Sequence, residues 1–471
     1  MYRSDELWRW SGAELARAIR SGAISSREAL ASSLDRIAAV NPKLNALVEV
    51  LAKQAGQAAD EADRRVRAGD AVGPLHGVPV ITKINSDQAG LATTNGIAAL
   101  KGVIVAEDSP QVACLRNAGA VIVGRSNVPA FSYRWFTTCE AHGRTLNPWD
   151  EQRTPGGSSG GAAAAVASGM VPIAQGNDIG GSIRYPAYAC GITGIRPTTG
   201  RVAGVTAPAN VDHPLSVQYM GVQGPLARTV EDLRLAFEVM SAPSDRDPVY
   251  VPAPLAGPPL QRPIRVGLLR HLGTAPSDPA IVEALDTAAR YLEGAGYVVE
   301  EIELPLLVEA YRLWWLLAME DFRPVMALVA NAGDPAMLQA ANTYYEIAAQ
   351  WWGKAPDLNA YLRGFARRGT LMRELSQFMT RYPLILLPVS SELAFEQDAD
   401  LAGIDRCRQL MEAQAAMMAI PCLGFPAISV PTGLHRGLPA GVQLLGQRFR
   451  EDTLFDAAEI IESHAGVLTP R

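Results

Sequence analysis

The sequence lacks the patterns that would place it in several large functional classes. Its five cysteines contain no CxxC pair, and their odd number argues against a disulfide framework and against a cysteine-ligated zinc site. The six histidines show no HExxH motif or other ligand spacing, so neither a metal nor another cofactor is expected. No cluster of basic residues stands out and the net charge is −6, which argues against nucleic acid as a partner.

Long apolar runs are also missing. The longest, AAAAVASGMVPIA, contains glycine and proline and is shorter than the ~18 residues that indicate a membrane span. The N-terminal segment MYRSDELWRW is charged and has no apolar core, so it does not resemble a signal peptide. We therefore expect a soluble, cytoplasmic protein with no membrane partner. Its hydrophobic content of 48% is sufficient for a large buried core.

The stretch that is most distinctive runs from Pro155 to Val202 and contains two serine turns bracketed by glycine, GGSSGG and GGS. A run of small residues between them predicts a tightly packed helix. Glycine lets the chain adopt conformations that other residues obstruct, and such conformations concentrate at functional sites. The two turns suggest a nucleophile and a helper. The alternatives are two surface turns or a phosphate loop, although the lysine of a phosphate loop is absent.

Local patterns predict helices and strands in alternation around this stretch. A helix, a glycine turn and the strand AVIVG over 110–127 form half of a βαβ unit, which implies a partly parallel sheet. Further helices are expected at 11–22, 25–41, 44–68, 160–169, 226–241 and 277–296, in most of 306–379 and in the last segment from 451. Further strands are expected at 76–85, 171–178, 264–269, 297–304, 384–389, 424–433 and 439–446.

A reactive serine needs a base to remove its proton. None of the histidines lies in a pattern that requires catalysis: His76 precedes a strand, and His142 and His213 lie in predicted loops. The other known partner is lysine, and Lys83 ends the otherwise apolar strand VPVITK. The strand pattern favours an edge residue whose stem covers apolar surface over a buried amine. A basic lysine must be neutral, and burial can supply the pKa shift of about 2–3 units that this requires.

Many segments, in order along the chain, resemble the amidase signature family of serine hydrolases. GGSSGG, GNDIGGSIRYPA and GITGIRPTTGRV are similar to the signature itself, and GPLHGVPVITK is similar to the segment that carries the family's lysine. AGAVIVGRSN, HGRTLNPWD, GFPAISVPTGLHRGLPAGVQLLG and LARAIRSGAISSREALASSLDRIAAVNPKLNALV are similar to other recurring segments. The resemblance covers most of 11–240 and 380–463 and is weak over 245–380.

The resemblance implies a Ser–cis-Ser–Lys triad. By residue-for-residue match, Ser182 is the nucleophile, Ser158 is the bridging serine in a cis peptide, and Lys83 is the base. Neutral Lys83 would take a proton from Ser158, which would take one from Ser182, and an acyl-enzyme would form. Ser159 is expected to hold its turn by local hydrogen bonds, and Cys190 is expected to be a small core residue.

The resemblance also implies an oxyanion hole and a fold. Backbone N–H groups of Ile179, Gly180 and Gly181, with that of the nucleophile, would bind the developing oxyanion. Asp178 and Arg184 are interpreted as a structural pair that fixes this loop. The implied fold is a single large α/β/α domain with a central mixed sheet. It would comprise N-terminal helices at about 5–70, a signature core at about 71–240, a proline-rich linker at about 242–263, a variable helical specificity region at about 306–380 and a C-terminal return at about 381–471.

Departures from the family pattern lie near the site. Ile84 stands where the family usually has aspartate, Asn177 where it usually has threonine, and the GKTN-type turn is GRSN here, followed by Ala130 in place of an acidic residue. The triad is intact, so the departures predict an unusual substrate preference rather than loss of activity.

Aromatic residues predict a pocket for a bulky or aryl group. Phe131, Tyr133 and Trp135 in FSYRWF are the candidate lining residues, together with one member of a tryptophan pair in 306–379. Two adjacent tryptophans on one helix, such as Trp314 and Trp315, are not expected to face the same pocket.

We therefore expect an amidase acting on hydrophobic or aryl small-molecule amides. The alternatives are carbamates, esters or cyclic amides cleaved with the same triad, a glutamine-amidotransferase subunit that depends on partner chains, and a catalytically silent binding protein, against which the intact triad argues. A homodimer is the expectation for this family.

Overall fold

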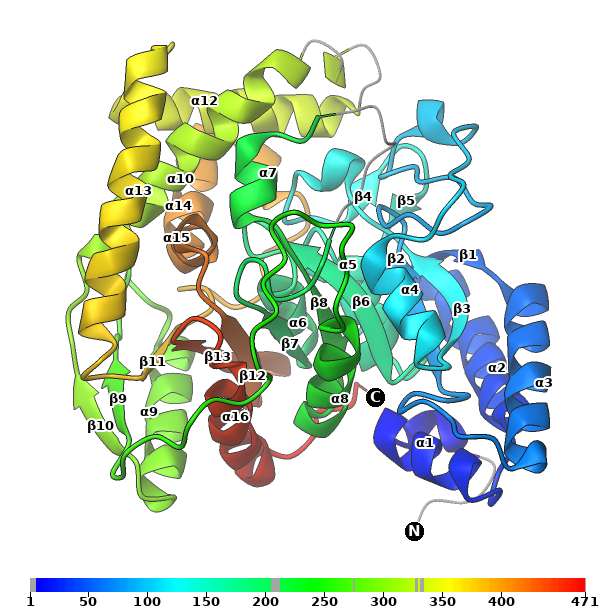
Figure 1. Cartoon of the computed structure of the whole chain (residues 1–471). Helices are drawn as coiled ribbons and strands as arrows, with labels where there is room; N and C mark the ends of the chain where they lie inside the picture. Colours follow the sequence, from blue (N-terminus) through cyan, green and yellow to red (C-terminus); the bar gives the residue numbers. More distant parts are fainter. Residues whose placement is uncertain (1–5, 205–211, 274–275, 327–328, 331–333, 471) are drawn as a thin grey trace.

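The computed structural model describes residues 6–204, 212–273, 276–326, 329–330 and 334–470, so residue 5, where the helical N-terminal region was expected to begin, lies outside the described residues. One large mixed sheet runs through the molecule, and helices cover both of its faces (Figure 1). The predicted α/β/α fold with a central mixed sheet is therefore confirmed.

The sheet has eleven strands in the order β1-β3-β2-β6-β8-β7-β12-β13-β11-β9-β10 within the described residues. Parallel pairs join β3, β2 and β6 at one end and β11, β9 and β10 at the other, and antiparallel pairs join the strands between them. The strands are β1 Leu47–Val50, β2 Pro79–Lys83, β3 Val121–Ser126, β6 Ile173–Asp178, β7 Thr193–Arg196, β8 Val222–Ala227, β9 Arg265–Leu268, β10 Val298–Glu301, β11 Leu384–Pro388, β12 Ala427–His435 and β13 Leu438–Gly446, with a separate small pair of β4 Thr138–Cys139 and β5 Gly143–Arg144.

The helices are α1 Gly12–Arg20, α2 Ser26–Leu44, α3 Ala52–Ala68, α4 Pro110–Asn117, α5 Gly160–Ala167, α6 Arg184–Cys190, α7 Leu215–Met220, α8 Val230–Met240, α9 Pro279–Gly294, α10 Leu306–Phe322, α12 Pro335–Trp352, α13 Leu358–Phe378, α14 Ile404–Ala413, α15 Ala415–Leu423 and α16 Glu451–Ala465. None of these helices is long and apolar enough to cross a membrane in the described part of the chain. The predicted helical character of 306–379 is confirmed by α10, α12 and α13, which gather at one end of the molecule (Figure 1).

Successive side chains of the buried strands pack on opposite faces of the sheet. In β11, Leu384 and Leu386 pack in a cluster with residues of α1, α8, α9 and α16, whereas Ile385 and Leu387 pack in a second cluster with residues of α10, α13 and α15. Successive side chains of a strand point to opposite faces, so each buried strand contributes to a core on both sides. The helices α10, α13 and α15 therefore lie on the face that also carries α6, whose Tyr185 and Tyr188 belong to the second cluster.

The helix between the two serine turns consists of small residues, and the space around it is very tight. All residues of α5 are buried, and a Cβ atom on Gly161 would lie only 2.6 Å from the carbonyl oxygen of Ala46 and from the amide nitrogen of Asn127. A larger side chain at this position would push the helix away from the strands that hold the site. The prediction of a tightly packed helix between the two serine turns is confirmed.

Three local predictions were wrong. Helix α2 continues through Pro42 to Leu44, and it ends at Asn45, which adopts a left-handed conformation with φ +50°. Residues 47–50, predicted as helix, form β1 because they pair antiparallel with β3. Residues 222–227 form β8, so the next helix begins only after its correctly predicted cap, Thr229.

Candidate active site

Lys83 is a buried residue of an inner strand, not the edge residue that the strand pattern favoured. Strand β2 lies between β3 and β6, and Lys83 is 0% exposed. Its Nζ atom lies 2.6 Å from Oγ of Ser158 and donates to Oδ1 of Asn177 at 2.7 Å. The lysine therefore joins the end of β2 to the first serine turn, 75 residues later, and to the end of β6.

Burial lowers the pKa of Lys83 well below its ordinary value, although the negative charge of Asp178 opposes part of this effect. Removing an ammonium group from water penalises its charged form. A neutral amine has a lone pair that can accept a proton from the hydroxyl group 2.6 Å away. Burial, a lowered pKa and contact with a hydroxyl group, which a lysine base requires, occur together at Lys83.

Ser158 and Ser182 lie on the wall of the same cavity. The peptide bond between Gly157 and Ser158 is cis, as the resemblance implies. The backbone N–H of Ser159 donates to the carbonyl oxygen of Ser182 at 3.2 Å, which ties the two turns together. Lys83 and Ser158 are joined by a hydrogen bond. Among the described residues, no direct hydrogen bond joins the hydroxyl groups of Ser158 and Ser182.

The loop that presents Ser182 is held by a buried carboxylate. Asp178 accepts hydrogen bonds from the backbone N–H groups of Gly181 and Ile183 at 3.0 and 3.2 Å, and from Nε of Arg184 at 3.0 Å. Burial favours protonation of Asp178, but the guanidinium groups of Arg184 and Arg196 outweigh it and hold the pKa at about 2. The expected pairing of Asp178 with Arg184 as a structural element is confirmed, and the carboxylate is ionised at neutral pH.

The backbone N–H groups of the loop fall into two kinds. Those of Ile179, Gly180 and Ser182 donate to no protein acceptor within the described residues, and these three residues line the cavity. The N–H of Gly181, which the resemblance implies as a further donor, is already occupied by Asp178. Gly181 has φ +93°, and a Cβ atom there would lie 2.6 Å from Met417, so only glycine fits.

The cavity in front of the two serines has a volume of about 690 Å³ and a strongly aromatic side. Phe131, Tyr133 and Trp135 all line it, as the sequence predicted. The aromatic wall, as we call this side, comprises these three residues with Trp314, Trp315, Met319, Phe322 and Tyr344. A cavity of this size accommodates a ligand considerably larger than a simple aliphatic amide.

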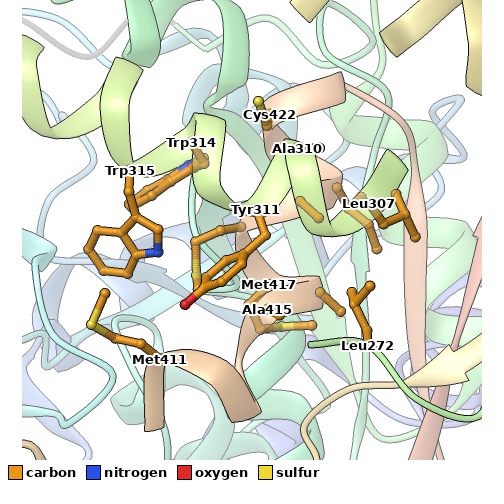
Figure 2. Packing of buried hydrophobic residues seen from close by; sticks show 14 of the residues in the cluster. Leu272, Leu307, Ala310, Tyr311, Trp314, Trp315, Met411, Ala415, Met417 and Cys422 are labelled. Carbon is orange, nitrogen blue, oxygen red and sulfur yellow. The ribbon is translucent and has the colours of Figure 1, made fainter. Parts of the chain in front are cut away.

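Both tryptophans of the first pair line this cavity, so the expectation that only one could do so was wrong. Their ring centroids lie 5.0 Å apart at an interplanar angle of 84°, and Figure 2 shows both projecting from α10, with Trp315 beside Met411. Two adjacent residues of one helix therefore contribute to the same cavity. The second pair, Trp351 and Trp352, packs partly buried against the core and does not line this cavity.

Sequence reasoning missed the buried ion pair beneath the aromatic wall. Arg134 lies between two lining residues in the sequence but does not line the cavity, and it donates to both carboxylate oxygens of Asp400 at 2.6 and 2.7 Å. The hydroxyl group of Tyr344 lies 3.5 Å from the same carboxylate. One carboxylate therefore fixes the loop that carries Tyr133 and the helix that carries Tyr344. The charge of Arg134 inside an aromatic run was the only available signal.

Asn177, which departs from the family pattern, also has a structural role. Its Oδ1 atom accepts from Lys83, and its Nδ2 atom donates to Asn85 at 2.9 Å. Asn85 in turn donates to Oγ of Ser132 at 2.9 Å, and Ser132 donates to Asn95 at 2.7 Å. These amides form a chain from the lysine to the loop of the aromatic wall. Sequence comparison marked Asn177 as unusual but not as a partner of Lys83.

Other candidates have structural surroundings. Cys190 is fully buried, and burial raises the pKa of its thiol, which keeps it protonated. The Nε2 atom of His76 lies 3.0 Å from the carbonyl oxygen of Ala62, away from the cavity. No group of three or more histidine, cysteine, aspartate or glutamate side chains is arranged to hold a metal ion in the described ranges.

Comparison with known proteins identifies the family of the chain. The amidase family model matches residues 28–455. The chain belongs to the amidase family. The amidase is 42% identical to an indoleacetamide hydrolase of Bradyrhizobium diazoefficiens, over 99% of its own length and 88% of that protein's. It is 32% identical to a glutamyl-tRNA(Gln) amidotransferase subunit of Symbiobacterium thermophilum, over 95% of each chain.

A solved structure supports the same assignment. The amidase superposes on a bacterial aryl acylamidase of the amidase signature family with a TM-score of 0.83 and 28% sequence identity, over 97% of this chain and 96% of the other. The protein is therefore an enzyme that hydrolyses amide C–N bonds, and the resemblance to the amidase signature family is confirmed.

Proposed function

We propose that this amidase hydrolyses small primary arylacetamides, with indoleacetamide as its best substrate. The observation that carries the proposal is the buried contact of 2.6 Å between Lys83 and Ser158 at the edge of a cavity with an aromatic wall. The name of the 42% identical relative supports the choice of an indole substrate. Offset or edge-to-face contacts with aromatic rings contribute about 0.5–1.5 kcal/mol beyond simple burial of surface.

In the proposed reaction, neutral Lys83 removes the proton from Ser158, and Ser158 removes the proton from Ser182 as its oxygen attacks the amide carbon. The C–N bond then breaks, the same relay returns a proton to the nitrogen, and ammonia leaves. A water molecule attacks the acyl-enzyme by the same route and releases the arylacetate. Free N–H groups of the 179–182 loop stabilise the oxyanion in both steps.

Two alternatives use the same residues. Carbamates, esters or cyclic amides would react by the same relay, and only substrate comparison separates them. A role in a glutamine-dependent amidotransferase, as a subunit that produces ammonia, is suggested by the 32% identical relative, but the aromatic wall offers little to the polar side chain of glutamine. The small-molecule partner, the homodimer and the cytoplasmic location stay predictions.

The test combines active-site labelling with a substrate panel. A fluorophosphonate probe is expected to label the wild type and not Ser182→Ala or Lys83→Ala. Ser168→Ala is the matched control, because Ser168 bonds to Ala164 at the end of α5, outside the cavity. Among indoleacetamide, phenylacetamide, acetamide, an aryl carbamate and glutamine, the first is expected to have the highest kcat/KM. Labelling that survives Ser182→Ala, or glutamine as the best substrate, would refute the proposal.

A further inference from the structure

Two indole rings of the aromatic wall hold consecutive backbone carbonyls just ahead of Ser182. Nε1 of Trp314 donates to the carbonyl oxygen of Ile179 at 2.8 Å, and Nε1 of Trp135 donates to that of Gly180 at 2.8 Å. Both tryptophans also line the cavity. The two tryptophans that would contact an aryl substrate therefore also donate hydrogen bonds to the proposed oxyanion loop.

A held carbonyl also determines where the next N–H points. The cis peptide bonds of the described chain are at 157–158 and 262–263, so both peptide units of the loop are trans. In a planar trans peptide the C=O and N–H groups point in opposite directions. Trp314 therefore turns the N–H of Gly180 away from its own ring, and Trp135 does the same to the N–H of Gly181.

The two peptide units differ in how firmly they are fixed. The unit between Gly180 and Gly181 is held at both ends, because Trp135 binds its oxygen and Asp178 accepts from its nitrogen at 3.0 Å. The unit between Ile179 and Gly180 has no protein acceptor for its N–H among the described residues. The direction of the free Gly180 N–H therefore depends on the hydrogen bond from Trp314.

Packing fixes the Trp314 ring itself. A Cβ atom built on Gly180 would lie 3.2 Å from the ring, so the indole lies directly against the loop. The rings of Trp314 and Trp315 meet edge to face with 5.0 Å between their centroids, and both residues are at most 9% exposed. Figure 2 shows the two rings together on α10. The donor cannot move far without displacing a closely packed neighbour.

We propose that Trp314 is a positioning residue for the oxyanion hole: its indole N–H aims the backbone N–H of Gly180 at the substrate oxygen. This inference rests on the proposed nucleophile, Ser182. An aryl group that packs against the wall presses on the ring that orients the donor. Part of the aryl binding energy is then realised in kcat and not only in KM, because contacts that act in the transition state accelerate the chemical step.

The test is Trp314→Phe, which keeps an aromatic ring and removes the donor. Deleting an oxyanion donor outright lowers kcat by a factor of about 10²–10³. In Trp314→Phe the N–H of Gly180 is still present but is no longer held in direction, so kcat is expected to fall about tenfold with KM changed less than threefold. Trp135→Phe removes the same kind of bond from the same loop, yet Asp178 still holds that peptide, so a smaller effect is expected. Trp352→Phe is the control for a general disturbance of α10, because Trp352 also donates to a carbonyl of this helix, that of Arg312 at 2.7 Å, but does not line this cavity.

Two binding measurements separate positioning from simple damage. Benzylboronic acid forms a tetrahedral anionic adduct with a serine oxygen, and Trp314→Phe is expected to weaken this adduct about tenfold. Binding of phenylacetamide, measured by calorimetry in a Ser182→Ala background, is expected to change less than threefold. If Ser182→Ala retains activity, the proposed function itself fails. If Ser182→Ala is inactive while Trp314→Phe changes only KM, or has no more effect than Trp135→Phe, the positioning role alone is overturned.

Discussion

Oδ1 of Asn177 lies 2.7 Å from Nζ of Lys83 and accepts a hydrogen bond from it. The amide carries no charge, so it orients the amine without stabilising the ammonium form as a carboxylate would. Together with the contact to Ser158, this leaves the lone pair of a neutral Lys83 available to the serine hydroxyl group. Asn177, marked in the sequence only as a departure from the family pattern, is thus part of the environment that sets the protonation of Lys83, the proposed base.

Asn177→Asp is expected to shift the pH profile of activity. A carboxylate in contact with Lys83 raises the pKa of the amine, typically by about 1–3 units. Because activity needs the neutral amine, the acid limb of kcat/KM should move to higher pH by about 1 unit or more, measured with indoleacetamide between about pH 5 and 10. Asn117→Asp, which adds the same charge at an exposed position on α4, should leave the limb in place. An unchanged limb in Asn177→Asp would show that another group controls it.

Tyr133→Ala is expected to weaken recognition of aryl substrates selectively. The Tyr133 ring lies 6.1 Å from that of Tyr344 and 6.3 Å from that of Phe322, on the aromatic wall. Loss of an aromatic contact and of buried area should raise KM for indoleacetamide about tenfold, while kcat/KM for acetamide falls less than about threefold. Tyr291→Ala is the control, because Tyr291 stacks on His464 at 4.5 Å on another face. Equal losses for both substrates would argue against an aryl pocket here.

Asp400→Asn is expected to destabilise the fold strongly. Arg134 and Asp400 are 1% and 0% exposed in their side chains. Removing one partner leaves a buried charge less compensated, which typically costs about 3–5 kcal/mol of unfolding free energy. Urea denaturation followed by fluorescence measures the difference. Glu231→Gln breaks the exposed Arg17–Glu231 pair, whose side chains are 60% and 58% exposed, and should cost less than about 1 kcal/mol. Similar costs for the two variants would contradict this reasoning.

Glu462→Gln is expected to stabilise the protein at alkaline pH. Burial, opposed by a hydrogen bond from the backbone N–H of Val230, raises the pKa of Glu462 to about 7. The folded state then binds more protons than the unfolded state between the ordinary pKa and 7, so stability is lost as the pH rises through this window. Glutamine keeps the acceptor and cannot ionise. The gain should be about 1–3 kcal/mol at about pH 8 and near zero at about pH 4, by denaturation at both values. A gain that is independent of pH would exclude ionisation as its cause.

Sequence patterns predicted most elements correctly because their signals are local. Glu28 and Ser25 form a capping box in the structure, and Thr229 and Asp278 cap their helices. Strand β1 was missed because residues 47–50 become a strand only by pairing with β3, which lies far along the chain at 121–126. Local propensity carries no information on a partner that distant.

In the candidate site, too, the features that depend on distant parts of the chain could not be predicted from local patterns. The motif resemblance brought Lys83, Ser158 and Ser182 together, whereas the strand pattern alone favoured a surface role for Lys83. Its burial depends on Ser158 and Asn177, which come from other parts of the chain. The hydrogen bonds of Trp135 and Trp314 to the 179–182 loop could not be predicted, because they require the 131–136 segment and helix α10 each to pack against this loop.

The position of the β12–β13 hairpin in the sheet has a consequence for how the chain is made. Strands from residues 47–227 form one continuous half, ending at β7, and β9, β10 and β11 form the other end. In the described sheet, the hairpin at 427–446 alone pairs with both β7 and β11. The ribosome therefore synthesises residues 1–426 before the hairpin that joins the two halves exists. Until the hairpin pairs with it, β7 is an open edge of the kind that can pair with strands of other chains. Newly made chains of this enzyme depend on the residues from 427 onward to close that edge.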